Sequence, residues 1–335
     1  RKGDVSSYRG FIDMNLSLEQ RSQEKRRLLR NFRELPIFLY IVGMLIVFSI
    51  IIPGFFTARN FINISRQIAV VGILSMGMTL AILTAGIDLS VGSILSFAIS
   101  IGGMGIPDGR SIWVVYPLVL GFGLILGLIN GFLITRVAVP AIIITLGTMN
   151  IYRGITMIVT QGKYITPIPS QFLYIGRGLI PFLFLLGTVI LFIYITLFTR
   201  FGRNIYAIGG SEQSAIYSGV PVQKYKIAVY AISGVLSAFA GLIFVGRSGF
   251  IQPQAGIGYE MNAIAAVVIG GTSIAGGVGS ILGSFLGSVL MGLILAGLTM
   301  LSVDPYWQGL VTGILIILAI SMDSFRQLRN ERRTL

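Results

Sequence analysis

The chain has 335 residues, of which 54% are hydrophobic and only 11% are charged. A soluble domain carries about a quarter charged residues, so this chain cannot cover a water-facing surface. Cysteine and histidine are both absent, which excludes disulfides, thiol nucleophiles, imidazole bases and Cys/His zinc sites. The composition therefore predicts a protein whose solvent is the lipid bilayer, and its continuous apolar runs, which lack the in/out alternation of barrel strands, predict an all-α fold.

The net charge of +13 comes from 25 Lys and Arg against 12 Asp and Glu. Most of these cations are clustered in residues 1–34, 199–226 and 326–333. No cluster has interleaved aromatic side chains that could stack on bases, so we expect no nucleic-acid partner. Basic clusters between apolar runs are typical of cytoplasmic loops.

Long apolar runs follow one another through most of the chain, and spanning the hydrocarbon takes about 20 such residues. They predict a polytopic transmembrane helical bundle over residues 35–325, with about ten spans. A basic segment, residues 1–34, precedes this permease domain without the apolar stretch of a cleavable signal peptide. A short tail, residues 326–335, follows it. The predicted spans are residues 36–53, 66–85, 90–106, 112–135, 139–160, 179–198, 226–247, 260–276, 279–301 and 306–322.

The orientation follows from the loops between these runs. With ten spans and the N-terminus inside, the inner loops and ends hold 18 Lys and Arg, and the outer loops hold six. Arg153 falls within a run and is not counted. The excess of cations on one side predicts that both termini are cytoplasmic.

Two predicted spans, residues 90–106 and 260–276, are short and rich in Gly and Ser. Each is expected to be tilted, broken or re-entrant. The sequence VGSIL at residues 91–95 recurs at residues 278–282, which is either a chance resemblance or the trace of a duplicated transporter core. In such cores interrupted helices meet near the membrane midplane.

Two runs carry glycine at every fourth position, which places the glycines on one helix face. Such faces let a neighbouring backbone approach closely, and they predict helix packing. The residues are Gly123, Gly127 and Gly131, then Gly279, Gly283 and Gly287.

Asp88 and Glu260 are the acidic residues within or bordering the apolar runs. Both lie at predicted segment ends, where water can solvate them. Each is expected to cap a helix N-terminus, and direct contact with a substrate is the alternative. A proton-coupled carrier would place more ionisable groups deep in the bundle.

Nothing in the sequence indicates an enzyme, because no nucleophile has a base partner and no metal-ligand cluster occurs. The Gly-Lys pair at Gly162 and Lys163 is followed by Tyr164, where a phosphate-binding loop needs Ser or Thr. We therefore expect no catalytic residue, no metal site and no cofactor held by this chain.

The basic loop at residues 199–226 contains a short predicted helix. Ser211 is a good N-cap and Gly219 a good helix stop, and they frame roughly 10 Å of helix. Because a helix this short is only marginally stable in water, we expect it to pack on its own bundle or to insert into another subunit.

These stretches resemble the ribose/galactose/xylose-type permeases of bacterial ABC transporters. Residues 84–92 (TAGIDLSVG) are similar to the family's Gly-Ile-Asp-Leu-Ser-Val-Gly-Ser signature, and residues 258–277 to its signature running from Gly-Tyr-Glu to Gly-Gly. The loop at residues 199–226 is similar to its cytoplasmic coupling region. The resemblance covers residues 36–325, with the motifs in family order.

The resemblance implies roles for particular residues. The loop would dock on a separate ATPase subunit through Gly202, Arg203, Gly209, Gly210, Ser211, Glu212, Ser214, Ala215 and Gly219. Asp88 and Ser90, with the region of Glu260, would belong to the translocation core. Further pathway candidates, chosen as polar or aromatic groups near segment ends, are Gln67, Asn130, Asn150, Tyr259 and Asn262.

The chain departs from the family pattern at three places. Asn262 replaces the usual Asp, which leaves the identity of the sugar more open than the class of function. Ser211 replaces an Asn, and Ser214 with Ala215 replaces an Ala pair.

The family likeness also implies the partners and the location. The chain would be a non-catalytic permease in the bacterial cytoplasmic (inner) membrane, working as a dimer, usually with a second copy of itself. ATP and Mg would bind a partner ATPase subunit, and a periplasmic or lipid-anchored binding protein would deliver the sugar. An ion-coupled secondary carrier is the alternative.

Overall fold

The computed structural model describes residues 34–137 and 139–331, and they form helices joined by turns and irregular stretches. The predicted N-terminal segment (apart from Glu34) and residues 332–335 of the predicted C-terminal tail lie outside this range. The helices are α2 (Leu35–Ile51), α3 (Ala58–Leu83), α4 (Val91–Gly103), α5 (Ile112–Arg136), α6 (Ala141–Thr160), α7 (Ser170–Leu173), the 3-10 turn η1 (Tyr174–Gly176), α8 (Ile180–Phe198), α9 (Arg200–Gly210), α10 (Glu212–Tyr217), α11 (Val222–Ser248), α12 (Tyr259–Ile269), α13 (Ile281–Met300) and α14 (Pro305–Glu331).

Several helices begin at a Ser or Thr whose side-chain oxygen accepts a hydrogen bond from a first-turn N–H. Such a cap satisfies one of the free donors at a helix start, which explains why apolar segments begin where they do. The capping residues are Thr57, Ser111, Thr199, Ser211 and Ser280.

The predicted apolar segments each contain one helix. Six helices, namely α3, α5, α6, α8, α11 and α13, are long and apolar enough to cross a membrane. Helices α2, α4 and α12 and the apolar part of α14 are shorter. The fold is therefore a helical membrane bundle, as predicted, in which length and composition alone identify six of the predicted spans.

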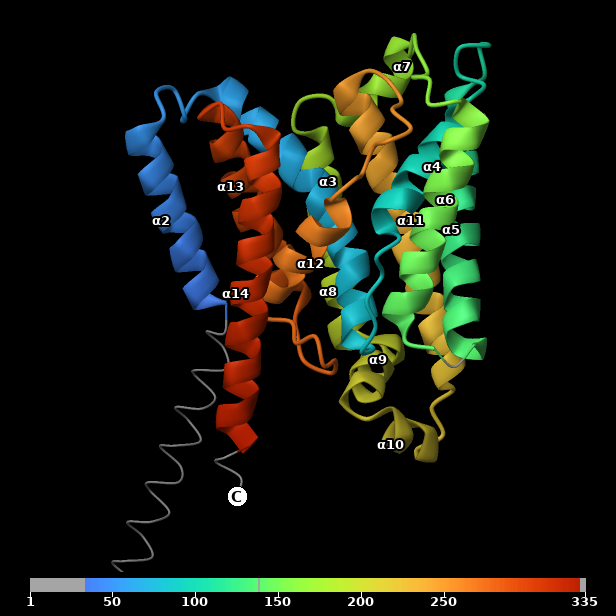
Figure 1. Cartoon of the computed structure of the whole chain (residues 1–335), viewed down its shortest axis with the longest axis vertical. Helices are drawn as coiled ribbons and strands as arrows, with labels where there is room; N and C mark the ends of the chain where they lie inside the picture. Colours follow the sequence, from blue (N-terminus) through green and yellow to red (C-terminus); the bar gives the residue numbers. More distant parts are fainter. Residues whose placement is uncertain (1–33, 138, 332–335) are drawn as a thin grey trace, which may run out of the picture.

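The bundle has two ends and a buried centre. In Figure 1 the helices run up and down between an end that carries α7 and an end that carries α9 and α10. Helix α3 is buried along most of its length and packs against α11, α13 and α8. Helices α5, α6 and α8 are much less buried, as suits helices facing lipid or another chain.

The two short Gly-rich segments are broken rather than re-entrant. The first broken segment consists of the non-helical residues 84–90 followed by α4, and the second consists of residues 249–258 followed by α12. In Figure 1 the first rises from the α9 end into the middle of the bundle before α4 begins, and α4 continues to the α7 end. The second runs the opposite way, from the α7 end to the α9 end. Both helices therefore begin inside the bundle.

The predicted glycine faces lie against neighbouring helices. A Cβ on Gly123 would lie 2.5 Å from the carbonyl oxygen of Gly234, and Gly127 and Gly131 meet the same helix, α11, at Tyr230 and Ile227. Missing side chains therefore let α5 and α11 pack backbone to backbone.

The second glycine repeat brings α13 close to α12 and the turn that follows it. A Cβ on Gly283 or Gly287 would collide with the carbonyl oxygens of Gly270 and Ala266. Gly279 precedes α13 and packs on the side chain of Thr272.

Candidate functional site

The two broken segments cross at Gly92 and Gly256. A Cβ on Gly256 would lie 2.5 Å from the carbonyl oxygen of Gly92, and a Cβ on Gly92 would collide with the carbonyl oxygen of Gly256. Gly256 also has a φ of +75°, which favours glycine. The first turn of α4 therefore lies against the stretch that leads into α12, so polar groups from both helix starts gather in one place.

Asp88 lies just before α4 and is fully buried. Its Oδ1 accepts hydrogen bonds from the backbone N–H of Ser90 at 3.0 Å and from the Ser90 hydroxyl at 2.5 Å. Its Oδ2 accepts one from the Ser233 hydroxyl, on α11, at 2.8 Å. The N–H that Asp88 accepts belongs to Ser90, the residue just before α4, and α4 has no side-chain cap, so the expected capping role is not seen. The expected solvation is not seen either, because a broken segment begins its helix inside the bundle.

The hydrogen bonds extend from Asp88 to two more helices. Asn130 on α5 donates from its Nδ2 to the Ser90 hydroxyl at 2.7 Å, and the Tyr152 hydroxyl on α6 donates to the Asn130 Oδ1 at 3.0 Å. The donors of Ser90, Ser233 and Asn130 point toward the carboxylate, and the Tyr152 hydroxyl also lies 3.2 Å from the carbonyl oxygen of Leu126. Such an arrangement stabilises a buried negative charge and joins the first broken segment to α5, α6 and α11.

Glu260 lies in the first turn of α12 and is also buried, which again differs from the expected solvated position. Its Oε1 accepts a hydrogen bond from the N–H of Gly258 at 3.2 Å. Its Oε2 lies 3.5 Å from Nη2 of Arg153, which comes from α6. The same Arg153 nitrogen donates to the carbonyl oxygen of Gly256 at 3.4 Å. Arg153 therefore connects α6 to the second broken segment.

The other predicted pathway residues do not form one cluster with these groups. Gln67 is half-buried on α3, and Asn150 is exposed on α6, where its Nδ2 donates to the carbonyl oxygen of Leu146. Tyr259 is half-buried and its ring packs edge-on against Phe244. These positions put the remaining candidates on several different helices.

Asn262 lies half-buried on α12 and its Oδ1 accepts a hydrogen bond from the Thr312 hydroxyl of α14 at 3.3 Å. The residue that replaces the family's Asp thus has a neutral partner inside this chain.

Sequence reasoning missed Tyr152, Arg153 and Ser233. Arg153 had a detectable signal, because a cation within an apolar run is costly unless something pairs with it. Tyr152 and Ser233 had none, since a Tyr or Ser inside a membrane helix is ordinary.

The predicted coupling loop at residues 199–226 contains two helices, α9 and α10, at one end of the bundle, and the first residues of α11 (Figure 1). Ser211 caps α10, accepting the N–H of Ser214 at 3.2 Å, and Gly219 follows the helix with a φ of +79°. Ala215 is buried against Ile208 and Val222, so one face of α10 packs on its own chain. The opposite face is open, because the Tyr217 side chain is 80% exposed.

Some of the predicted docking residues on α9 and α10 are exposed, and others pack against the bundle. Arg203, Gly210, Ser211, Glu212, Ser214 and Gly219 are exposed. A Cβ on Gly209 would collide with the carbonyl oxygen of Leu83, and one on Gly202 with that of Thr196. Gly202 and Gly209 therefore hold α9 against the bundle.

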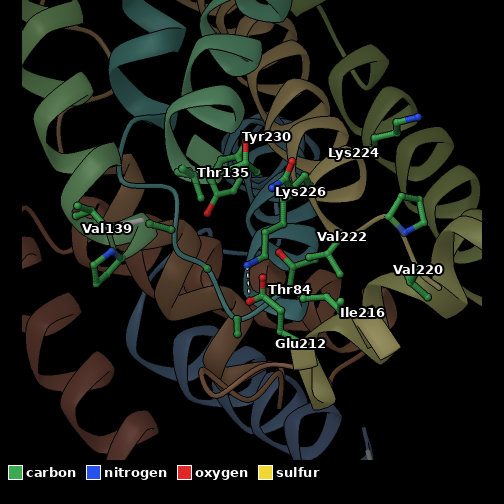
Figure 2. A pocket seen from close by; sticks show the side chains of 17 residues that line it. Thr84, Thr135, Val139, Glu212, Ile216, Val220, Val222, Lys224, Lys226 and Tyr230 are labelled. Carbon is green, nitrogen blue, oxygen red and sulfur yellow. Dashed lines mark hydrogen bonds and ion pairs between the residues drawn. The ribbon is translucent and has the colours of Figure 1, made fainter. Parts of the chain in front are cut away.

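A pocket of about 780 Å³ lies behind α10, between the start of α11 and the turn from α5 to α6 (Figure 2). Two of its lining residues, Lys226 and Glu212, form an ion pair of 2.7 Å that ties α11 to α10. Among the described residues, no group of three or more His, Cys, Asp or Glu could hold a metal ion.

Comparisons with known proteins agree with this architecture. The family model described as branched-chain amino acid transport system / permease component matches residues 60–320. The ribose import permease protein RbsC of Haemophilus influenzae is 40% identical over 86% of this chain and 92% of its own length. RbsC of Escherichia coli K12 is 41% identical over 85% of this chain and 91% of its own length.

A further relative is the autoinducer 2 import system permease protein LsrC of Photorhabdus luminescens, which is 34% identical over 89% of this chain and 91% of its own length. No solved structure matches the chain. The family model covers more than half of the chain, and the relatives align along most of it. The chain therefore belongs to the family of permease components of branched-chain amino acid transport systems.

Proposed function

We propose that this chain is the membrane subunit of an ABC importer that moves a sugar of the ribose class into the cytoplasm. Relatives named as ribose import permeases align over nine-tenths of their own length at about 40% identity. The observation that carries the proposal is the crossing of the two broken segments at Gly92 and Gly256. Helices that begin in the middle of a membrane bundle are typical of transporters, because their free N–H groups serve a substrate path.

The energy source is a separate ATPase. The sequence lacks a phosphate-binding loop. Helix α10, which is part of the basic loop at residues 199–226, presents an exposed face with Tyr217 at one end of the bundle. That end would be cytoplasmic by its positive charge, and so would both termini. An ATPase subunit, with its ATP and Mg, would dock on α10, and a binding protein would deliver the sugar at the α7 end.

The sugar path would lie on the face formed by α6 and α12. Asn150 is exposed on this face, and Arg153 lies one turn further along α6. Polar groups at this depth are costly against lipid, so another protein or water must cover them. Gly147 and Gly154 are open on the same helix, with no atom within 4 Å of an added Cβ. A second copy of this chain is the proposed cover, so that two such faces enclose the path in the inner membrane.

Reconstitution tests the proposal. The chain, its ATPase and its binding protein are placed in sealed vesicles, and accumulation of radiolabelled D-ribose is followed with and without ATP. Accumulation should require all three proteins and ATP hydrolysis. Uptake without the ATPase subunit that collapses with an ion gradient would instead establish the ion-coupled carrier.

A further inference from the structure

The cavity of about 780 Å³ behind α10 shares no residue with the hydrogen-bonded network of Asp88 or with the Arg153–Glu260 pair. Its wall is formed by the first turns of α6 and α11, the turn between α5 and α6, one side of α10 and the beginning of the first broken segment (Figure 2). Small-molecule sites in proteins usually measure about 300–1,000 Å³. The cavity is therefore large enough for a ligand of the size of a phosphorylated sugar.

Two helices begin at this wall without a side-chain cap. Helix α6 follows Pro140 and α11 follows Pro221, and no side chain caps either start. Ala141 and residues 222–224, in the two first turns, line the cavity. The N–H groups of Ala141 and Gln223 have no hydrogen-bond partner among the described residues. Free N–H groups at the positive end of a helix favour an anion, so both helix starts favour negative charge in the cavity.

Lys226 adds a full positive charge to the cavity. Its half-buried side chain reaches from α11 toward α10, where its Nζ donates to the Glu212 Oε2 at 2.7 Å (Figure 2). An ammonium has three donors, and the described residues use one of them. The lining holds two lysines, Lys224 and Lys226, against the single carboxylate of Glu212. The charged side chains therefore favour an anion, as the helix starts do.

The inner wall holds a polar group that the described chain leaves unused. Tyr230 lines the cavity and is 1% exposed, and its hydroxyl is buried without a hydrogen-bond partner among the described residues. The hydroxyl lies against Gly86, where an added Cβ would collide with it. Buried donors without acceptors are costly and call for a partner outside the chain itself. Tyr230 thus marks the inner end of the site, whereas the charged contact lies at Lys226.

A phosphate group suits these surroundings. Its charged oxygens can accept from a lysine ammonium and from backbone N–H groups at a helix start at the same time. A neutral sugar lacks the charge that these groups favour. Glu212 opposes an anion because its carboxylate already occupies one donor of Lys226. The Glu212 side chain is 51% exposed, so water can solvate it when an anion takes its place.

We propose that this cavity binds a phosphate-bearing anion, with Lys226 and the first turns of α6 and α11 as donors and Glu212 as the competing group. The anion is carried by a soluble phosphorylated sugar or by a lipid headgroup, which present the same chemistry to the site. The proposal is independent of which sugar the chain moves. Binding would exchange Glu212 for the anion and so release one tie between α10 and α11.

The test measures binding of radiolabelled D-ribose 5-phosphate to the full chain in nanodiscs of phosphatidylcholine, a lipid without net charge. Lys226→Gln should weaken binding about tenfold or more, because it removes a hydrogen bond between charged groups. Glu212→Gln should tighten binding about twofold to fivefold, because it removes the competing carboxylate. Lys163→Gln makes the same charge change beyond the other end of α6 and should match wild type.

The opposite signs separate a binding site from a structural ion pair, since loss of such a pair would change the affinity in the same direction in both variants. Shifts in the same direction, wild-type affinity in Lys226→Gln, or no saturable binding by wild type overturns the proposal. Unlabelled inorganic phosphate should compete with the probe, and competition by D-ribose would also overturn the proposal.

The lipid arm identifies the source of the anion. Phosphatidylglycerol is added to the nanodiscs, and binding of the same probe is measured again. Displacement of the probe supports the site with a lipid headgroup as its ligand, and unchanged binding supports it with a soluble phosphate.

Discussion

The backbones of Gly92 and Gly256 touch where the two broken segments cross, although the two residues lie far apart in the sequence. Neither position has room for a Cβ, because each would run into the carbonyl oxygen of the other. The start of α4 and the approach to α12 are thereby held together.

Replacing Gly92 by alanine should separate the broken segments. Overpacking at a rigid site costs about 1–3 kcal/mol, and here the colliding atom is backbone and cannot rotate away. The thermal midpoint of the detergent-purified protein should fall clearly. Gly147→Ala on the open face of α6 is the matched control, and an equal fall in both variants would show that the crossing is not special.

Asp88→Asn should be more damaging than its size suggests. The carboxylate accepts from Ser90 and Ser233, whereas asparagine has one accepting oxygen, and a Ser233 hydroxyl that faces its N–H₂ must accept instead of donate. The change removes hydrogen bonds to a charged group, each of which contributes about 1.5–3 kcal/mol. Thermal unfolding should show that loss, with a smaller one for Ser233→Ala. Among the described residues, the Ser237 hydroxyl donates within its own helix, to the carbonyl oxygen of Ser233, so Ser237→Ala should be nearly neutral. A stable Asp88→Asn protein would contradict this description of the network.

Tyr217→Ala separates docking from folding. The side chain is 80% exposed on α10, so its removal should leave the thermal midpoint unchanged. Exposed tyrosines often dominate binding, and truncation of one costs about 2 kcal/mol or more at an interface. Sugar-stimulated ATPase activity of the assembled transporter should therefore fall by roughly tenfold or more.

Gly209→Val is the contrasting variant, because it should prevent folding by colliding with Leu83. Normal ATPase coupling in Tyr217→Ala would mean that the partner docks elsewhere.

The orientation can be measured directly because the chain has no cysteine. Gln171→Cys on α7 and Ser218→Cys beyond α10 both place a thiol at an exposed position. A membrane-impermeant maleimide should label Gln171→Cys on cells whose outer membrane has been removed and whose inner membrane is sealed. It should label Ser218→Cys only after the inner membrane is opened. The opposite labelling would reverse the orientation that the positive loops predict.

The exposed ion pair between Lys226 and Glu212 should contribute little to stability. Their side chains are 19% and 51% exposed, and such surface pairs contribute about 0–1 kcal/mol. Lys226→Gln should therefore shift the thermal midpoint slightly, and less in high salt than in low salt. A large, salt-independent shift would show that the pair holds α10 in place.

The sequence alone predicted three local features, because each depends on neighbouring residues. They are the apolar runs, the capped start of α10 and the glycine faces. Helix period, hydrogen-bond capping and close packing act over a few residues, and they identified the membrane bundle and the short helix framed by Ser211 and Gly219. A break at the two short segments was also among the expected possibilities, although the non-helical stretches, residues 84–90 and 249–258, precede most of the predicted ranges.

The environment of the charged groups depended on the tertiary structure. Asp88 and Glu260 look like solvated residues at segment ends, and they are buried because non-helical stretches carry the helix starts into the bundle. Arg153 meets Glu260 although helices α7 to α11 lie between them in the sequence. Partners that are distant in sequence leave no periodic pattern, since their meeting is set by how whole helices pack, and only that packing decided which polar groups share the centre of this protein.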